Sequence, residues 1–221
     1  MKPKNKSAPD TGASRKPVVK RPVKTLAHEV RIIGGQWKRT KLPVADKPGL
    51  RPTPDRVRET LFNWLGQDLT GWCCVDAFAG TGALGFEAAS RGATEVRMVE
   101  QDAALVAQLK TIQARLQAAA VQVQRGDGVG ALKHLAPASV DLVFLDPPFD
   151  AGLFDAALQA AGRAVKPGGC VYLEAPSIWA DEALAQFELK AHRHLKAGAV
   201  HAHLLVPVST LTSAQAASGT A

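Results

Sequence analysis

The chain is poor in cysteine and lacks long apolar runs. Its 221 residues contain only three cysteines, two of them adjacent at Cys73 and Cys74. An odd number without ligand spacing excludes a disulfide framework and a zinc site. No stretch reaches the roughly 18 consecutive apolar residues of a membrane-spanning helix, and no apolar run follows the N-terminus as in a signal peptide. We therefore expect a soluble, cytoplasmic protein without a metal site and without a membrane contact.

Acidic residues are scarce in the first part of the chain. Residues 1–58 contain 16 Lys and Arg against 4 Asp and Glu, whereas residues 59–221 contain 11 against 16. The net charge of +7 therefore combines a basic front, residues 1–58, with an acidic body. Such a front indicates a polyanionic partner, because each cation that neutralises a phosphate releases counterions. For residues 1–28 alone a solubilising arm is an equally good interpretation, but the basic residues continue past Ile33, where the sequence looks folded.

Composition and periodicity divide the chain into four segments. Residues 1–28 are rich in Lys, Pro and Ser and predict a disordered basic arm, and residues 209–221 predict a disordered tail. Residues 29–53 form a small strand-and-loop extension that we expect to contact RNA. Residues 54–208 form a single α/β domain.

Strand and helix patterns alternate through this domain. Apolar, β-branched runs predict strands at 72–78, 95–100, 121–125, 140–145 and 170–174, and helical stretches follow at about 83–91, 102–118, 128–135, 152–165 and 180–186. This alternation predicts a parallel sheet covered on both faces. Two last strands, 187–195 and 200–208, are joined by four residues and must form an antiparallel hairpin. Ahead of the domain core we expect a strand at 30–33 and a helix from Pro54 to Leu65, N-capped by Thr53.

The first chemical motif lies where the strand at 72–78 turns into a helix. Gly80, Gly82 and Gly85 satisfy G-x-G-x-x-G in the required strand–helix context. Glu100 ends the next strand, where a carboxylate can accept hydrogen bonds from ribose hydroxyls. These features favour a nucleoside-containing cofactor, and the alternative is a purely structural glycine turn.

The acids around this turn favour one class of cofactor. Asp76 precedes Gly80 by four residues, close to the place where a dinucleotide would seat its pyrophosphate. A carboxylate there suits a cation better, and S-adenosylmethionine (SAM) carries an amino group and a sulfonium. Asp127 follows the strand at 121–125 and could accept from the adenine amino group, or it could only cap the next helix.

The second motif, Asp146-Pro147-Pro148-Phe149, ends the strand at 140–145. The prolines hold the backbone extended, so that the carbonyls of Asp146 and Pro147 stay out of any helix. The Asp146 carboxylate and the Pro147 carbonyl can then accept both N–H bonds of an exocyclic amine and free its lone pair for an electrophile. Phe149 offers a flat face for an extruded base. The alternative is a turn that only ends a strand.

These residues resemble the amino-methyltransferase signature [D/N]-P-P-[F/Y/W]. Four blocks together are similar to the RsmD-type family of bacterial 16S rRNA (guanine-N2)-methyltransferases: RIIGG at 31–35, RPTPDRVRETLFNWL at 51–65, DAFAGTG at 76–82 and FLDPPF at 144–149. The likeness spans about residues 30–208. It implies a Rossmann-like, seven-stranded SAM-dependent methyltransferase sheet with an antiparallel C-terminal hairpin, over a methyltransferase domain at 54–208.

The resemblance also implies a substrate and a site. The substrate would be a guanine of small-subunit rRNA, in an assembled or assembling subunit, and we expect the enzyme to be a monomer. Asp146, Pro147 and Phe149 would hold the guanine. The residues implied in SAM binding are Asp76, Gly80, Thr81, Gly82 and Glu100, with Asp127 near adenine, and Thr53, Arg56 and Glu59 closing the pocket.

Other functions remain open on the residues alone. The D-P-P-F motif also permits methylation of adenine N6 or cytosine N4 in DNA, or of a protein glutamine. From other classes, an NAD-dependent oxidoreductase would fit the glycine motif, and a non-catalytic RNA-binding protein would fit the basic front. The four histidines of the last hairpin, at 192, 194, 201 and 203, are interpreted as a solvated sheet face.

Overall fold

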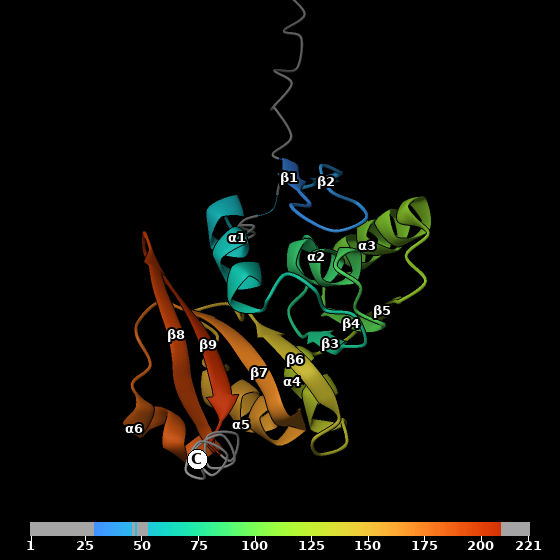
Figure 1. Cartoon of the computed structure of the whole chain (residues 1–221). Coiled ribbons are helices and arrows are strands. Elements are labelled where there is room, and N and C mark those ends of the chain that lie inside the picture. The colour runs from blue at the N-terminus through green and yellow to red at the C-terminus, as the bar shows by residue number, and fades with distance from the viewer. Residues whose placement is uncertain (1–28, 46, 48–52, 209–221) are drawn as a thin grey trace, which may run out of the picture.

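A computed structural model of the chain describes residues 29–45, 47 and 53–208. The arm predicted at 1–28 and the tail predicted at 209–221 lie outside the described residues. A seven-stranded sheet lies between two layers of helices (Figure 1). No helix in the described part of the chain is long and apolar enough to cross a membrane.

The strand order is β5-β4-β3-β6-β7-β9-β8. β3 to β7 are parallel to one another, whereas β9 is antiparallel to both β7 and β8. The predicted parallel sheet and antiparallel C-terminal hairpin are thus confirmed. The strands are β3 (Cys73–Asp76), β4 (Glu95–Glu100), β5 (Val121–Arg125), β6 (Val140–Leu145), β7 (Val165–Ala175), β8 (Leu189–Ala197) and β9 (Val200–Pro207).

The helices cover the two faces of the sheet. One layer holds α1 (Asp55–Trp64), α2 (Ala83–Ser90) and α3 (Ala103–Leu116), and the other holds α4 (Gly128–Lys133), α5 (Phe154–Ala164), α6 (Asp181–Leu184) and the 3-10 turn η1 (Ala185–Phe187). Successive side chains of a strand point to opposite faces of the sheet, so the strands contribute to two separate hydrophobic cores. Phe144 and Tyr172 belong to the buried cluster under α1–α3, and Val143 and Val171 belong to the cluster over α4 and α5.

The N-terminal extension differs from its prediction. The strand predicted at 30–33 is β1 (Glu29–Arg31), and it pairs antiparallel with an unpredicted strand, β2 (Lys41–Pro43). β2 is short and buries only Leu42, so its sequence carries no alternating pattern long enough to recognise.

β7 is longer than the strand predicted at 170–174. It begins directly after α5, and its pairing with β6 shifts register before Leu142 pairs with Cys170.

The predicted N-cap of α1 is wrong. Pro54 occupies the cap position, and no side-chain hydrogen bond caps the helix. The hydroxyl of Thr53 instead donates to Glu174 Oε1 at 2.7 Å, 121 residues away in the chain. Thr53 is buried. Its hydroxyl contacts a distant carboxylate instead of the nearby backbone N–H that an N-cap residue would contact.

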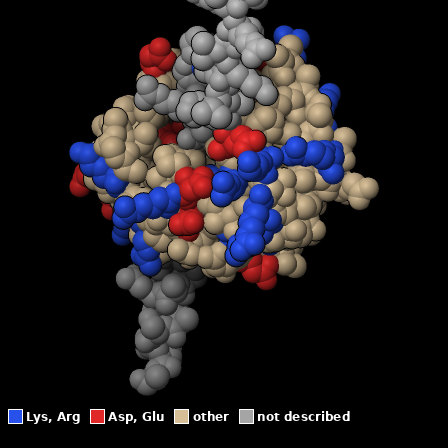
Figure 2. All heavy atoms as spheres, turned by 90° about the horizontal axis from the view of Figure 1, so that it is seen from above, with Lys and Arg blue, Asp and Glu red and all other residues tan. Residues whose placement is uncertain are grey.

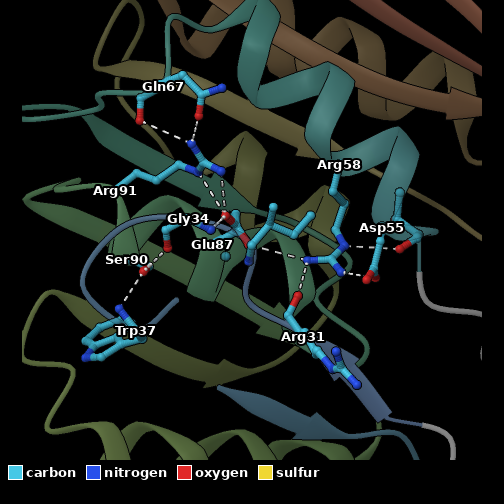
Figure 3. Close-up of polar contacts among 12 residues, drawn as sticks. Arg31, Gly34, Trp37, Asp55, Arg58, Gln67, Glu87, Ser90 and Arg91 are labelled. Atoms are coloured by element: carbon cyan, nitrogen blue, oxygen red, sulfur yellow. Dashed lines mark hydrogen bonds and ion pairs between the residues drawn. The ribbon is translucent and has the colours of Figure 1, made fainter. Parts of the chain in front are cut away.

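A buried carboxylate fixes the extension to the α/β domain (Figure 3). Glu87 of α2 accepts hydrogen bonds from the backbone N–H groups of Ile33 and Gly34, each at 2.7 Å. The same carboxylate pairs with Arg58 of α1 at 3.4 Å and with Arg91 at 2.8 Å. All three side chains are buried. This cluster, the Glu87 clamp, joins β1–β2, α1 and α2 into one unit.

Candidate functional site

A cavity of about 1040 Å³ opens at the carboxyl ends of the central parallel strands. Ligands of open α/β sheets bind at this edge, where the strand order reverses. β3 lies beside both β4 and β6 at that reversal. The cavity brings together eight of the predicted site residues: Thr53, Asp76, Gly80, Thr81, Glu100, Asp146, Pro147 and Phe149.

The glycine turn forms one wall of the cavity. Gly80 and Gly82 adopt positive φ values of 50° and 80°, which side chains rarely tolerate. A Cβ atom on Gly82 would lie 2.6 Å from Leu109 Cδ2, so a side chain here would be strained in its backbone conformation and would also displace a packed neighbour. Gly82 sits at the N-terminal cap of α2, behind the residues that line the cavity.

Glu100 closes this turn from the end of β4. Its Oε2 accepts from Gly80 N–H at 2.9 Å, and its Oε1 accepts from Asp102 N–H at 2.8 Å. Each oxygen retains a further lone pair. The backbone therefore holds the carboxylate in a fixed orientation at the cavity wall, where it can still accept from ligand hydroxyls.

Asp76 is the deepest acid of the cavity. It is 3% exposed, and its Oδ2 accepts from Gly85 N–H at 3.0 Å. Burial raises the pKa of Asp76 to about 7, against the lowering effect of the Gly85 hydrogen bond and with a further increase from the charge of Glu100. A cation in the cavity would favour the ionised form.

The D-P-P-F segment forms the facing wall. Burial raises the pKa of Asp146 well above its usual range, and the charges of Glu174 and Asp76 raise it further. Phe149 is 39% exposed, and its ring lies 6.2 Å from that of Phe154 in α5. The packed ring of Phe154 supports Phe149, which keeps a free face.

Glu174 is a site residue that the sequence reasoning missed. It is the last residue but one of β7, is 4% exposed and lines the cavity. Burial raises its pKa, although hydrogen bonds from Thr53 and Tyr172 oppose that change. The available signal was a lone acid at the end of an apolar strand. Lys47 and Asp102 also line the cavity and form an ion pair with each other.

Besides Gly82, three predicted cofactor residues lie outside the lining of the cavity. Arg56 and Glu59 occupy exposed positions of α1. Asp127 caps α4, accepting from Gly130 N–H at 2.7 Å, while its neighbours Gly126 and Gly128 line the cavity. Cofactor contacts of these three residues stay predictions.

Residues 30–206 match the model of a family described as Conserved hypothetical protein 95. The chain belongs to this family. Ribosomal RNA small subunit methyltransferase D of Escherichia coli strain K12 is 46% identical over 137 residues, which are 62% of this chain and 69% of that protein. The Haemophilus influenzae protein of the same name is 42% identical over 151 residues, 66% of this chain and 78% of that protein.

Solved structures agree with the family assignment. The Escherichia coli protein yhhF has a TM-score of 0.68 at 38% identity, and the alignment covers 81% of this chain and 98% of that one. The Haemophilus influenzae protein HI0767 has a TM-score of 0.66 at 33% identity, covering 80% and 98%. The predicted methyltransferase fold is confirmed, and this member of the Conserved hypothetical protein 95 family is a methyltransferase.

Four histidines of this family member, at 192, 194, 201 and 203, lie on the hairpin of β8 and β9. His203 is buried, and burial lowers its pKa to about 4. Its Nε2 accepts from Trp179 N–H at 3.2 Å. The prediction of a solvated face is therefore wrong for His203, because the loop carrying Trp179 covers it. Within the described residues no group of three His, Cys, Asp or Glu side chains could hold a metal ion.

Proposed function

We propose that the protein transfers a methyl group from SAM to the exocyclic N2 amine of a guanine in small-subunit rRNA. The observation that carries this proposal is the placement of Asp146 and Pro147 in the same cavity as the glycine turn and Asp76. The names of the relatives support ribosomal RNA as the substrate, and the sequence resemblance supports guanine N2.

The residues of the cavity fit SAM. The carboxylate of Asp76 is buried without a cationic partner among the described residues, which suits a ligand that brings positive charge. Glu100 has lone pairs for the ribose hydroxyls, and the Gly80–Gly82 turn leaves room for close backbone approach. When bound, SAM would supply an electrophilic methyl group, and as the S–CH3 bond breaks its sulfonium would become the neutral thioether of S-adenosylhomocysteine.

The D-P-P-F segment prepares the amine for this group. The Asp146 carboxylate and the Pro147 carbonyl accept hydrogen bonds from the two N–H groups of the amine. These bonds turn the nitrogen lone pair away from the ring and toward the cofactor side of the cavity. After methyl transfer the nitrogen is positively charged and must lose a proton. The raised pKa of Asp146 suits its carboxylate to take up that proton. Phe149 stacks on the base.

The basic front supplies the affinity for RNA. Exposed cations of the extension include Arg31, Lys38, Arg39 and Lys41. Arg115 of α3 donates to the backbone carbonyl of Lys41 at 2.9 Å, which continues this charge onto the domain. Figure 2, seen from the side of β1 and β2, shows Lys and Arg side chains in a broken band. Phosphate contacts position a protein without reading sequence.

The shape of the folded RNA must therefore select the target base. We propose that the substrate is an assembled or assembling small subunit, and that the protein acts on it as a monomer in the cytoplasm. The test is to incubate the purified protein and SAM with small subunits that lack this methylation. Nuclease digestion and mass spectrometry should recover N2-methylguanosine at one position. N6-methyladenosine, or methylation of DNA alone, would replace this function with the DNA alternative.

Asp146 variants test the chemistry of the same reaction. Asp146→Ala should abolish transfer and leave SAM affinity nearly unchanged, and Asp146→Asn should retain partial activity because an amide oxygen still accepts. Asp155→Ala, an exposed acid in the first turn of α5, is the matched control. Transfer by Asp146→Ala at the wild-type rate would show that the amine is not held by this carboxylate.

A further inference from the structure

Glu174 is a buried acid that the transfer step does not use. β6 and β7 run parallel, and Leu145 pairs with Leu173. Asp146, which directly follows β6, and Glu174 of β7 come next after this pair and therefore lie side by side. Both line the cavity, so a second acceptor stands next to the one that holds the amine.

Two hydroxyl groups fix the carboxyl group of Glu174. Thr53 Oγ1 donates at 2.7 Å and Tyr172 OH donates at 2.9 Å, and both hydrogen bonds end on Oε1. From the described residues no hydrogen bond reaches Oε2. Oε2 is therefore the oxygen of Glu174 that can accept a hydrogen bond from a ligand in the cavity. A ligand N–H in the cavity would supply the missing partner.

The chemistry of the bases decides which ligand can do so. An ionised carboxylate only accepts hydrogen bonds. In guanine, the ring atom N1 beside the 2-amine carries a hydrogen and donates. In adenine and cytosine the ring nitrogen beside the amine is an acceptor, and in a glutamine side chain the neighbour is a carbonyl oxygen. Only guanine among these substrates presents a donor beside its amine.

We propose that Glu174 Oε2 accepts the N1–H of the target guanine and so selects guanine over bases whose amine adjoins an acceptor. Asp146 and Pro147 would hold the amine, and Glu174 would read the adjacent ring atom. This inference rests on the proposed function, because it concerns the same site. A hydrogen bond from N1–H favours the ionised carboxylate and opposes the effect of burial.

The test compares guanine with 2-aminopurine, which keeps the 2-amine but has an acceptor at N1. Small subunits are reconstituted with 16S rRNA carrying either base at the mapped position. Wild-type kcat/KM should favour guanine by about a hundredfold or more. Glu174→Gln can donate from its amide to the acceptor, so the preference should shrink at least tenfold. An equal preference in wild type and Glu174→Gln would overturn the inference.

Three controls keep the outcome specific. Glu182→Gln, an exposed acid of α6, should keep the wild-type preference. Glu174→Ala replaces Glu174→Gln if the latter does not fold, and it should lower the preference by weakening guanine alone. SAM affinity of each variant reports damage to the cofactor side. Failure of wild type to methylate guanine at all would instead contradict the proposed function.

Discussion

At the residue scale the cavity contains three carboxyl groups whose simultaneous ionisation is unfavourable, because each negative charge raises the pKa of its neighbours. Asp76, Asp146 and Glu174 each have a raised pKa, with burial as the leading cause. They come from three neighbouring strands, β3, β6 and β7, on the face that packs under α1. Such a cluster is unfavourable in the free protein and becomes favourable with a cation and N–H donors present. The site is therefore built for its ligands at the expense of the unliganded fold.

The raised pKa of Asp76 predicts how SAM affinity depends on pH. Below its pKa of about 7 the carboxyl is protonated in the free protein, and a cationic ligand must displace that proton. Affinity should fall about tenfold for each pH unit below 7 and level off above it. Calorimetry across this range measures the effect, and Asp76→Asn should bind weakly at every pH. An affinity that does not change with pH would remove Asp76 from the cation site.

The raised pKa of Asp76 has the opposite effect on the stability of the free protein, which should decrease as the pH rises. A folded pKa raised above the unfolded value means that the folded state binds the proton more tightly. The free energy of unfolding without cofactor should therefore be highest near pH 4 and decrease as the pH rises through about 7. Urea titrations at several pH values measure it, and Asp76→Asn should flatten the decline. Rising stability over this interval would show that another group dominates.

Glu100 gives a prediction of cofactor binding alone. Glu100→Ala removes the acceptor that we propose for the ribose hydroxyls and also frees Gly80 N–H and Asp102 N–H. SAM should bind about 1–3 kcal/mol more weakly, the range for hydrogen bonds to charged groups. Glu100→Gln should lose less, since its amide oxygen still accepts. Calorimetry measures both, with Glu182→Ala as an exposed control, and unchanged affinity in Glu100→Ala would exclude Glu100 from the site.

At the element scale the sequence predicts most of the domain and little of its assembly. The strands at 95–100, 121–125 and 140–145 match β4, β5 and β6. β6 is a nearly continuous apolar run with clear ends, whereas β5, at the edge of the sheet, is recognisable by its alternation of Val and Gln. The roles of Thr53 and Glu174 and the Glu87 clamp were not foreseen. Each depends on contacts between residues far apart in the chain, which local patterns do not encode.

The Glu87 clamp can be tested as an element-scale joint. Glu87→Ala leaves Arg58 and Arg91 buried without their shared carboxylate and frees the N–H groups of Ile33 and Gly34. Breaking one partner of a buried pair costs about 3–5 kcal/mol, so chemical denaturation should show a loss of that order. Glu59→Ala, an exposed acid of α1, should change stability by less than about 0.5 kcal/mol. Equal stability of both variants would mean that the clamp contributes nothing.

At the scale of the whole molecule, charge and chemistry are separated. The acids of the cavity lie at the carboxyl edge of the sheet, whereas the excess of cations lies in residues 1–58. The Glu87 clamp fixes the described part of that front, β1 and β2, to α2, which begins at the glycine turn. The proposed phosphate contacts of the extension would thus be held in a constant relation to the site where a base would enter. Orientation on RNA and transfer to one base would depend on the same rigid unit.

Removal of residues 1–28 tests how far affinity and target choice are separate. The deletion takes away eight Lys and Arg and one Asp. RNA binding should weaken, and the dependence of log affinity on log salt should become shallower, because fewer counterions are released. The methylated position should stay the same, since phosphate contacts carry no sequence information. A full-length variant with those eight cations replaced by Gln separates charge from length. It should behave like the deletion in filter-binding titrations and in product mapping on undermethylated subunits. A changed position in either variant would show that the arm takes part in choosing the target.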